Sequence, residues 1–338
     1  MLTNPVQIKD QPLALIDWLK AIGSQLILLH HFSRYGAAAD ALAPVSGSIG
    51  AWLEWEARLA VQAFLVVGGF LAMRAFSLRG GPTGLADWLR QCRRRFLRLA
   101  VPLWVALAAA VLAAAVARGL SDHPSIPAAP GLLQGVAHLL MLQDILGQEA
   151  LSAGIWYVAI DLQLFALIAL LCWLPPAAAV LAGIALAAAA LFGFNRDAAW
   201  EPWAPYFFGS YALGAAVWLA VARLSVRHGA MLVAAAGGLV AAALWVAWRD
   251  SLVVAAASAG LLLIGLRSGR AVGAPAAVRW LAAISYGVLL LHYPVFLVAD
   301  AVAEAWMPGQ VSGAVAAVVA AWGLTLILAD RLTARFER

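Results

Sequence analysis

An apolar stretch near the start of the chain, Leu13–Phe32, is long enough to cross a bilayer as a helix but carries four ionisable side chains. These are Asp17, Lys20, His30 and His31. An ionisable group at the centre of a membrane costs about 2.5–3.5 kcal/mol on insertion scales, so such groups face protein, water or substrate. At 100° per residue, Lys20 and His31 lie within about 20° of one helix face and about 16 Å apart along the axis. This span therefore belongs to a bundle of helices and presents a cation and an imidazole on one stripe.

The remainder of the chain is strongly apolar. Of its 338 residues, 64% are hydrophobic and 12% are charged, with a mean hydropathy of +0.89, whereas soluble domains carry about 25% charged residues. The sequence thus predicts an all-α, polytopic integral membrane protein with a single domain over residues 1–338. Ten apolar windows predict its spans: 13–33, 54–76, 97–117, 154–174, 176–194, 203–222, 229–248, 251–266, 279–300 and 312–330.

The distribution of basic residues predicts the orientation of these spans, because Lys and Arg collect in cytoplasmic loops. With ten spans both termini share one side, and that side holds most of the 22 basic residues, including Lys9, Arg270 and Arg338. A further apolar window, 131–147, would move the later basic clusters to the opposite side if it crossed. We therefore expect ten spans, cytoplasmic termini, and a re-entrant or surface helix at 131–147.

Five motifs occur in order along the chain: IDWLKAIGSQLILLHHF (Ile16–Phe32), AFLVVGGFL (Ala63–Leu71), CRRRFLRLAVPLW (Cys92–Trp104), WYVAIDLQLF (Trp156–Phe165) and SYGVLLLHYPVF (Ser285–Phe296). Together they resemble the motifs of the membrane-bound acyltransferase-3 family, whose members O-acylate polysaccharides, peptidoglycan and some small molecules. Three positions depart from the family pattern. Lys20 stands where Arg is usual, Gly68 where Ser is usual and Leu162 where a second Glu is common.

The resemblance implies an O-acyltransferase of a bacterial cytoplasmic (inner) membrane. Such an enzyme moves an acyl group, usually acetyl from acetyl-CoA on the cytoplasmic side, to a hydroxyl of a glycan or other acceptor on the outer side. Its expected partners are acyl-CoA, this acceptor and membrane lipid, and no nucleic acid. We expect the outer loops 34–53 and 118–153 to select the acceptor.

Cationic side chains at the inner ends of spans are the candidates for binding CoA, an anionic donor rich in phosphate. Arg94, Arg95 and Arg98 offer planar guanidinium groups suited to phosphate, although clustered Arg beside a span is also an ordinary topology signal. Lys20 and Asp17, one helical turn apart, form a second candidate donor contact. Pairing between these two side chains could equally serve only to neutralise them.

Acyl transfer to a hydroxyl needs a base for the hydroxyl proton, and histidine is the usual choice near neutral pH. His31 and His292 both fall in the outer half of the predicted bundle, and a transient acyl-histidine is an alternative route. Asp161 is predicted to orient an imidazole and stabilise its cation, as a carboxylate does in hydrolytic triads. The predicted catalytic residues are therefore His31, His292 and Asp161, the plain alternative being that a membrane histidine only hydrogen-bonds a neighbouring helix.

Polar residues near these groups are candidates for binding substrate. His30 projects about 100° away from His31, and Trp156, Ser285 and Tyr286 can line a polar cavity, although such residues also serve helix packing. The other histidines are expected at the surface: His123, His138 and His228.

No metal-ligand spacing such as C-x-x-C or H-E-x-x-H occurs in the sequence, so no metal site is predicted. The alternative function is a transporter or flippase of a lipid-linked or small polar substrate, with Asp17, Lys20 and Asp161 as intramembrane coupling groups. The sequence has no internal repeat and no matched pair of Gly/Pro-broken helices, which argues against transport. A purely structural scaffold leaves the ionisable groups of the first span unexplained.

Overall fold

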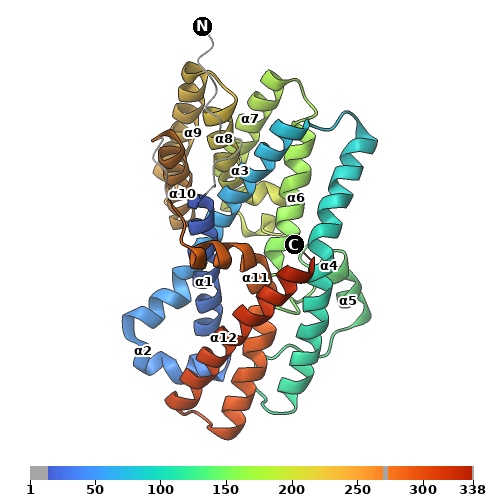
Figure 1. Ribbon diagram of the computed structural model, residues 1–338, viewed down its shortest axis with the longest axis vertical. Coiled ribbons are helices and arrows are strands. Elements are labelled where there is room, and N and C mark those ends of the chain that lie inside the picture. The colour runs from blue at the N-terminus through green and yellow to red at the C-terminus, as the bar shows by residue number, and fades with distance from the viewer. Residues whose placement is uncertain (1–13, 269–272, 337–338) are drawn as a thin grey trace. The chain divides into compact units, whose positions relative to one another are not determined.

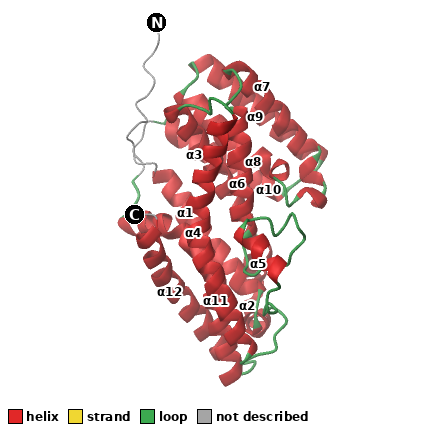
Figure 2. Ribbon diagram, turned by 90° about the vertical axis from the view of Figure 1, so that its right-hand side faces the viewer, coloured by secondary structure: helices red, strands yellow, loops and turns green. Residues whose placement is uncertain are grey.

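The computed structural model of the chain describes residues 14–268 and 273–336 (Figure 1). Among these residues the secondary structure is helical, without a strand (Figure 2). The helices are α1 (Ala14–Arg34), α2 (Ala37–Trp55), α3 (Val61–Arg79), α4 (Leu85–Arg118), α5 (Leu132–Leu139), α6 (Trp156–Leu171), α7 (Pro176–Phe192), α8 (Ala204–Ala222), α9 (Val226–Val246), α10 (Asp250–Arg267), α11 (Ala276–Trp306) and α12 (Val311–Phe336). Short 3₁₀ helices lie in the connections: η1 (Ala57–Ala60), η2 (Phe194–Arg196) and η3 (Ala198–Trp200).

Eight helical stretches of the described residues are long and apolar enough to cross a membrane, which confirms the prediction of an all-α polytopic bundle. They are the α2–α3 stretch, α4 and each helix from α7 to α12. The other two predicted spans lie on α1, which carries the ionisable residues, and on α6, which has 16 residues. The number of crossings and the cytoplasmic termini stay predictions, and Lys9, Arg270 and Arg338 lie outside the described residues.

Residues 34–53, expected as an outer loop, are mostly helical. They form α2, whose backbone leaves helical geometry at Gly47 with φ 54° and ψ −141°. The first N–H groups of α2, on Ala37 and Ala38, donate to the buried carboxylate of Asp300 at 3.0 and 2.7 Å. A carboxylate at a helix N-terminus accepts hydrogen bonds from N–H groups that have no partner within the helix. Its negative charge is also attracted by the positive end of the helix dipole. The side chain that stabilises the start of α2 therefore comes from α11, far away in the sequence.

The window 131–147 contains the short helix α5, which has 8 residues. At 1.5 Å per residue it rises about 12 Å, whereas a helical span needs about 20 residues. In α5, Ala137 and His138 are buried, whereas Leu132 and Leu133 are exposed. This segment does not cross a bilayer as a helix.

The chain forms two compact units, so the predicted single domain over 1–338 stays a prediction. Of the described residues, the first unit comprises 14–20, 61–96, 160–268 and 273–279, and the second comprises 21–60, 97–159 and 280–336.

In the first unit, α3 and α8 are in direct backbone contact. A Cβ added at Gly69 would lie 1.9 Å from the Tyr211 carbonyl oxygen, and one added at Gly214 would lie 1.8 Å from that of Val66. Both positions therefore require glycine, as at the close helix crossings of membrane proteins. Buried side chains of α3, α8 and α10, such as Phe70, fill the space around this contact.

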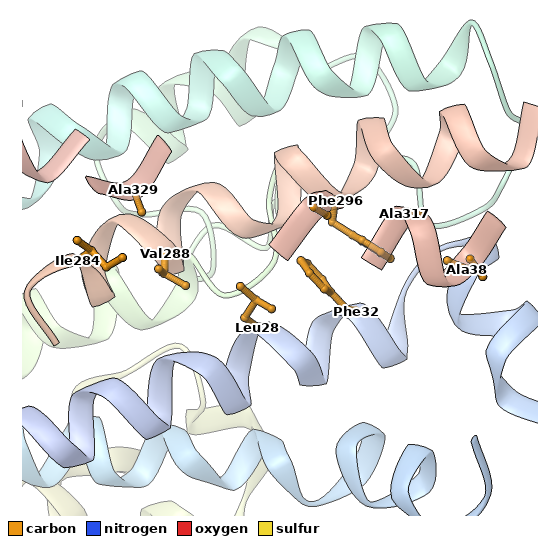
Figure 3. Packing of buried hydrophobic residues seen from close by; sticks show 10 residues of the cluster. Leu28, Phe32, Ala38, Ile284, Val288, Phe296, Ala317 and Ala329 are labelled. Carbon is orange, nitrogen blue, oxygen red and sulfur yellow. The ribbon is translucent and has the colours of Figure 1, made fainter. Parts of the chain in front are cut away.

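In the second unit, α1 packs along α11 and α12 (Figure 3). Leu28 and Phe32 of α1 point towards Val288 and Phe296 of α11, and the Phe32 and Phe296 rings stack with centroids 4.4 Å apart. Small residues of α12, such as Ala329, complete the cluster and allow the helices to approach closely. This apolar packing fixes the register of α1 against α11 and so positions the polar residues that lie between its members.

Candidate functional site

His31 of α1 and His292 of α11 meet inside the second unit, although they are 261 residues apart in the sequence. Their Nδ1 and Nε2 atoms, respectively, are 2.7 Å apart, and the two rings stack with centroids at 4.8 Å. His292 is fully buried and His31 is 8% exposed. The apolar contacts of Leu28 and Val288, one turn away on each helix, hold this arrangement. Two of the three predicted catalytic residues thus lie in direct contact.

The hydrogen bonds assign the proton positions in this pair. His292 Nδ1 lies 3.0 Å from the carbonyl oxygen of Val288, which can only accept, so Nδ1 carries a proton. A neutral imidazole has one N–H, so His292 Nε2 is unprotonated and accepts from His31 Nδ1. His31 Nε2 is then unprotonated, and it has no hydrogen-bond partner among residues 14–268 and 273–336. The pair therefore leaves one basic nitrogen available, on the ring that retains some exposure.

His30, a predicted substrate contact, lies beside this pair without joining it. Its ring centroid is 4.9 Å from that of His31, and its Nδ1 lies 3.2 Å from the carbonyl oxygen of Leu53. Because that oxygen accepts, His30 Nδ1 donates to the end of α2. His30 thus connects α1 with α2.

A turn before α6 lies against both imidazoles. Gly154 has φ +81°, and a Cβ there would lie 3.3 Å from His31 Cε1 and 3.8 Å from His292 Cε1. The turn is tied to α5 through His138, whose Nε2 accepts from the Leu151 N–H at 3.1 Å. The expectation that His138 lies at the surface is wrong, because the side chain is 1% exposed. The buried face of α5 includes this residue.

Asp161, the third predicted catalytic residue, lies in the first unit and forms an ion pair with Arg95. Both Nε and Nη2 of Arg95 donate to Asp161 Oδ2, at 3.1 and 2.5 Å. The Asp161 side chain is 7% exposed and that of Arg95 28%. The sequence predicts that Asp161 orients an imidazole, whereas its hydrogen bonds in the described residues go to this guanidinium. The two charges satisfy each other.

The Gly68 departure from the family pattern lies next to this ion pair. A Cβ at Gly68 would lie 3.6 Å from Asp161 Oδ1 and 3.0 Å from Cε2 of the Tyr211 ring. The Tyr211 hydroxyl is buried and has no hydrogen-bond partner among the described residues. The space beside Asp161 is therefore occupied by an aromatic ring where the family usually places a serine side chain.

The other predicted donor contacts are more exposed. Arg94 and Arg98 lie in α4, have exposed side chains and form no ion pair within the described part of the chain. Asp17 and Lys20 are both half-buried in α1, and the Asp17 carboxylate interacts electrostatically with the cations of Lys20 and Arg279. The arginines thus present free guanidinium groups, whereas Asp17 has cationic neighbours of its own.

The remaining predicted substrate contacts have partners within the protein. Ser285 is buried and its hydroxyl donates to the carbonyl of Ala282, one turn earlier in α11, at 2.9 Å. The Tyr286 hydroxyl donates to the Leu99 carbonyl at 2.8 Å. Trp156 is half-buried at the start of α6. Ser285 and Tyr286 therefore stabilise helices, and their role in binding substrate stays a prediction.

The described residues contain no group of three or more His, Cys, Asp or Glu side chains that could hold a metal ion. The described residues contain the His31–His292 pair, with one free basic nitrogen, and the arginine-rich helix α4.

Comparison with known proteins agrees with this chemistry. A family model described as an acyltransferase domain, that of the acyltransferase 3 family, matches residues 13–329, nearly the whole chain. No curated protein and no solved structure matches it. The match confirms the resemblance carried by the five motifs and favours acyl transfer over transport. The chain therefore belongs to the acyltransferase 3 family and is a multi-pass membrane acyltransferase.

Proposed function

We propose that the protein transfers an acetyl group from acetyl-CoA to a hydroxyl of a glycan or similar acceptor, with His31 as the general base. The observation that carries the proposal is the hydrogen bond between His31 Nδ1 and His292 Nε2, at 2.7 Å. It leaves His31 Nε2 unprotonated and directs the ring, as the carboxylate does for histidine in hydrolytic triads.

In this reaction the acceptor hydroxyl attacks the thioester carbonyl of the donor. His31 Nε2 takes the hydroxyl proton as the new C–O bond forms, and His292 Nε2 accepts a hydrogen bond from the resulting imidazolium. The C–S bond then breaks, and the proton passes to the leaving thiolate, which gives the ester and CoA. A positioned base of this kind contributes about 10²- to 10⁴-fold to a rate.

For the donor, we propose that Arg94 and Arg98 contact the phosphates of CoA. Both side chains are exposed, and a guanidinium group matches the geometry of phosphate oxygens. Arg95 completes this cluster with its guanidinium anchored on Asp161, and Lys20 with Asp17 forms a second cationic contact. By the positive-inside distribution of charge, the cluster lies on the cytoplasmic side of a bacterial inner membrane, and the acceptor is modified on the outer side.

The experiment uses inside-out membrane vesicles from the cells that naturally produce the protein, so that the native acceptor is retained and added acetyl-CoA reaches the cytoplasmic side. Vesicles are incubated with acetyl-CoA labelled in the acetyl group, and alkali-labile ester label is measured per amount of protein. Wild-type vesicles should accumulate label, whereas His31→Ala vesicles should be slower by about 10²-fold or more. A His228→Gln variant, altered at an exposed histidine in the first turn of α9, serves as the matched control and should behave like wild type.

Gel filtration and thermal unfolding in detergent establish whether each variant is folded. A folded His31→Ala variant with near-normal ester formation would contradict the role of His31. Wild-type vesicles that form no ester from labelled acetyl-CoA, but do so from a longer acyl-CoA, would contradict the acetyl assignment and leave the acyltransferase chemistry in place.

A further inference from the structure

The turn that lies against the imidazole pair is poorly stabilised by its own residues. Gly154 adopts a positive φ of +81°, which disfavours a residue with a side chain. Ser152, in the same turn, is 3% exposed, and its hydroxyl has no hydrogen-bond partner among the described residues. A buried hydroxyl without a partner destabilises the turn that contains it. Contacts from outside the turn must therefore hold this backbone against His31 and His292.

His138 supplies such a contact, and both of its ring nitrogens take part. Nδ1 lies 2.8 Å from the Gln134 carbonyl oxygen, one turn earlier in α5, and therefore donates to it. Nε2 accepts from the Leu151 N–H at 3.1 Å. Burial lowers the pKa of His138, which keeps the imidazole neutral and Nε2 able to accept near neutral pH.

The segment between α5 and this turn is tied back to the same helix by a further hydrogen bond, from the Gln134 amide to the Glu149 carbonyl at 2.9 Å. Within the segment, the Gln148 N–H donates to the Gln143 carbonyl at 2.8 Å. Beyond Glu149, as far as Gly154, the hydrogen bond that the described residues make with α5 is that between His138 and Leu151.

We propose that His138 is a positioning residue for the imidazole pair. By fixing Leu151 it holds the Gly154 backbone against one side of His31 and His292, which limits both the tilt of the rings and the access of reagents to them. The catalytic consequence rests on the proposed function of His31, whereas the positioning itself does not. A positional error of about 1 Å in a catalytic group can reduce a rate by about 100-fold.

Three substitutions separate the two hydrogen bonds of His138. His138→Leu removes both and keeps a side chain of similar bulk. His138→Asn carries an amide nitrogen near the position of Nδ1 and lacks an acceptor for Leu151. His138→Gln reaches further and places its amide oxygen near the position of Nε2, where it can accept from the Leu151 N–H. His228→Gln is again the control, because this side chain is exposed in the first unit.

Two measurements are made on each variant. The first is the maximal rate of ester formation and the KM for acetyl-CoA, in the vesicle assay. The second is the rate at which diethyl pyrocarbonate, a small electrophile that reacts with unprotonated imidazole nitrogen, modifies His31 in the purified protein, followed by tandem mass spectrometry that distinguishes His31 from His30. This second measurement does not depend on acyltransferase activity.

The proposal predicts that His138→Leu and His138→Asn lower the maximal rate about tenfold, the size expected for one lost buried hydrogen bond, with the KM for acetyl-CoA changed less than about twofold. In the same two variants the modification of His31 should become several-fold faster, and His138→Gln should restore both values. If His138→Leu does not fold, the comparison of Asn with Gln carries the test.

Folded His138→Leu and His138→Asn variants whose His31 reacts at the wild-type rate would overturn the positioning role. If His31 becomes more reactive but the maximal rate is unchanged, the positioning role stands and the role of His31 as base fails. The two proposals are thus tested separately.

Discussion

The imidazole pair of the second unit and the ion pair of the first differ in how they accommodate buried ionisable groups. In the Arg95–Asp161 pair a cation and an anion neutralise each other through two hydrogen bonds to one carboxylate oxygen. In the His31–His292 pair two neutral rings share one hydrogen bond, and a basic nitrogen of His31 remains unused. Both pairs place ionisable groups inside an apolar bundle, but the imidazole pair stays uncharged and keeps a basic nitrogen available for proton transfer.

This difference gives a way to weigh ionisable residues in membrane helices. Such residues are treated as functional candidates by default because of what they cost in lipid. Where two opposite charges form an ion pair, the stability of the fold is enough to explain why both residues are present. Where a held imidazole keeps a basic nitrogen without a partner, as in His31, stability of the fold does not account for the group, and function becomes the better explanation.

The comparison would be sharpened most by breaking the ion pair. Asp161→Asn leaves the Arg95 cation without its counter-charge, and Arg95→Gln leaves a buried carboxylate. Each should lower the free energy of unfolding by about 3 kcal/mol, at the low end for a buried pair because Arg95 is 28% exposed. The double variant, in which two amides can bond to each other, should recover a large part of this loss.

Reversible unfolding in mixed detergent measures these free energies. If the losses in free energy of unfolding of the two single variants add in the double variant, Arg95 and Asp161 do not stabilise each other. The contrast between the ion pair and the imidazole pair would then be contradicted.

A smaller effect is expected at the exposed arginines of the same helix. Arg94→Gln and Arg98→Gln should leave stability unchanged and raise the KM for acetyl-CoA about tenfold, since each would remove one charge-assisted hydrogen bond to a phosphate. The maximal rate should change little, because a contact made equally in ground and transition states affects KM. Steady-state kinetics in vesicles decides this. An unchanged KM in correctly inserted variants would show that these arginines act as topology signals.

Much of the fold could be predicted from the sequence because the signal for a membrane helix is local. Each of the ten apolar windows overlaps an α-helix over most of its length. The loop expected at 34–53 was wrong for a non-local reason, since the start of α2 is stabilised by Asp300, more than 260 residues away. No local pattern reports such a contact.

The site could be predicted as separate residues but not as pairs. His31 and His292 were both identified from motifs, whereas their contact depends on the packing of α1 against α11, and the Arg95–Asp161 pair similarly joins two helices. His138 is predicted at the surface because its segment is short and carries polar residues. Its burial depends on contacts from outside α5, such as that with the Leu151 N–H, which no local pattern reports.

The central claim is that His31 carries its proton on Nδ1 and keeps Nε2 free as a base. Nitrogen NMR of the folded protein, labelled in the imidazole nitrogens of its six histidines, reports this directly, with the His31 signals identified by their loss in His31→Ala. At neutral pH we predict a protonated Nδ1 and an unprotonated Nε2 for His31, and the same tautomer for His292. A proton on His31 Nε2, or a charged imidazolium, would contradict the proposed base.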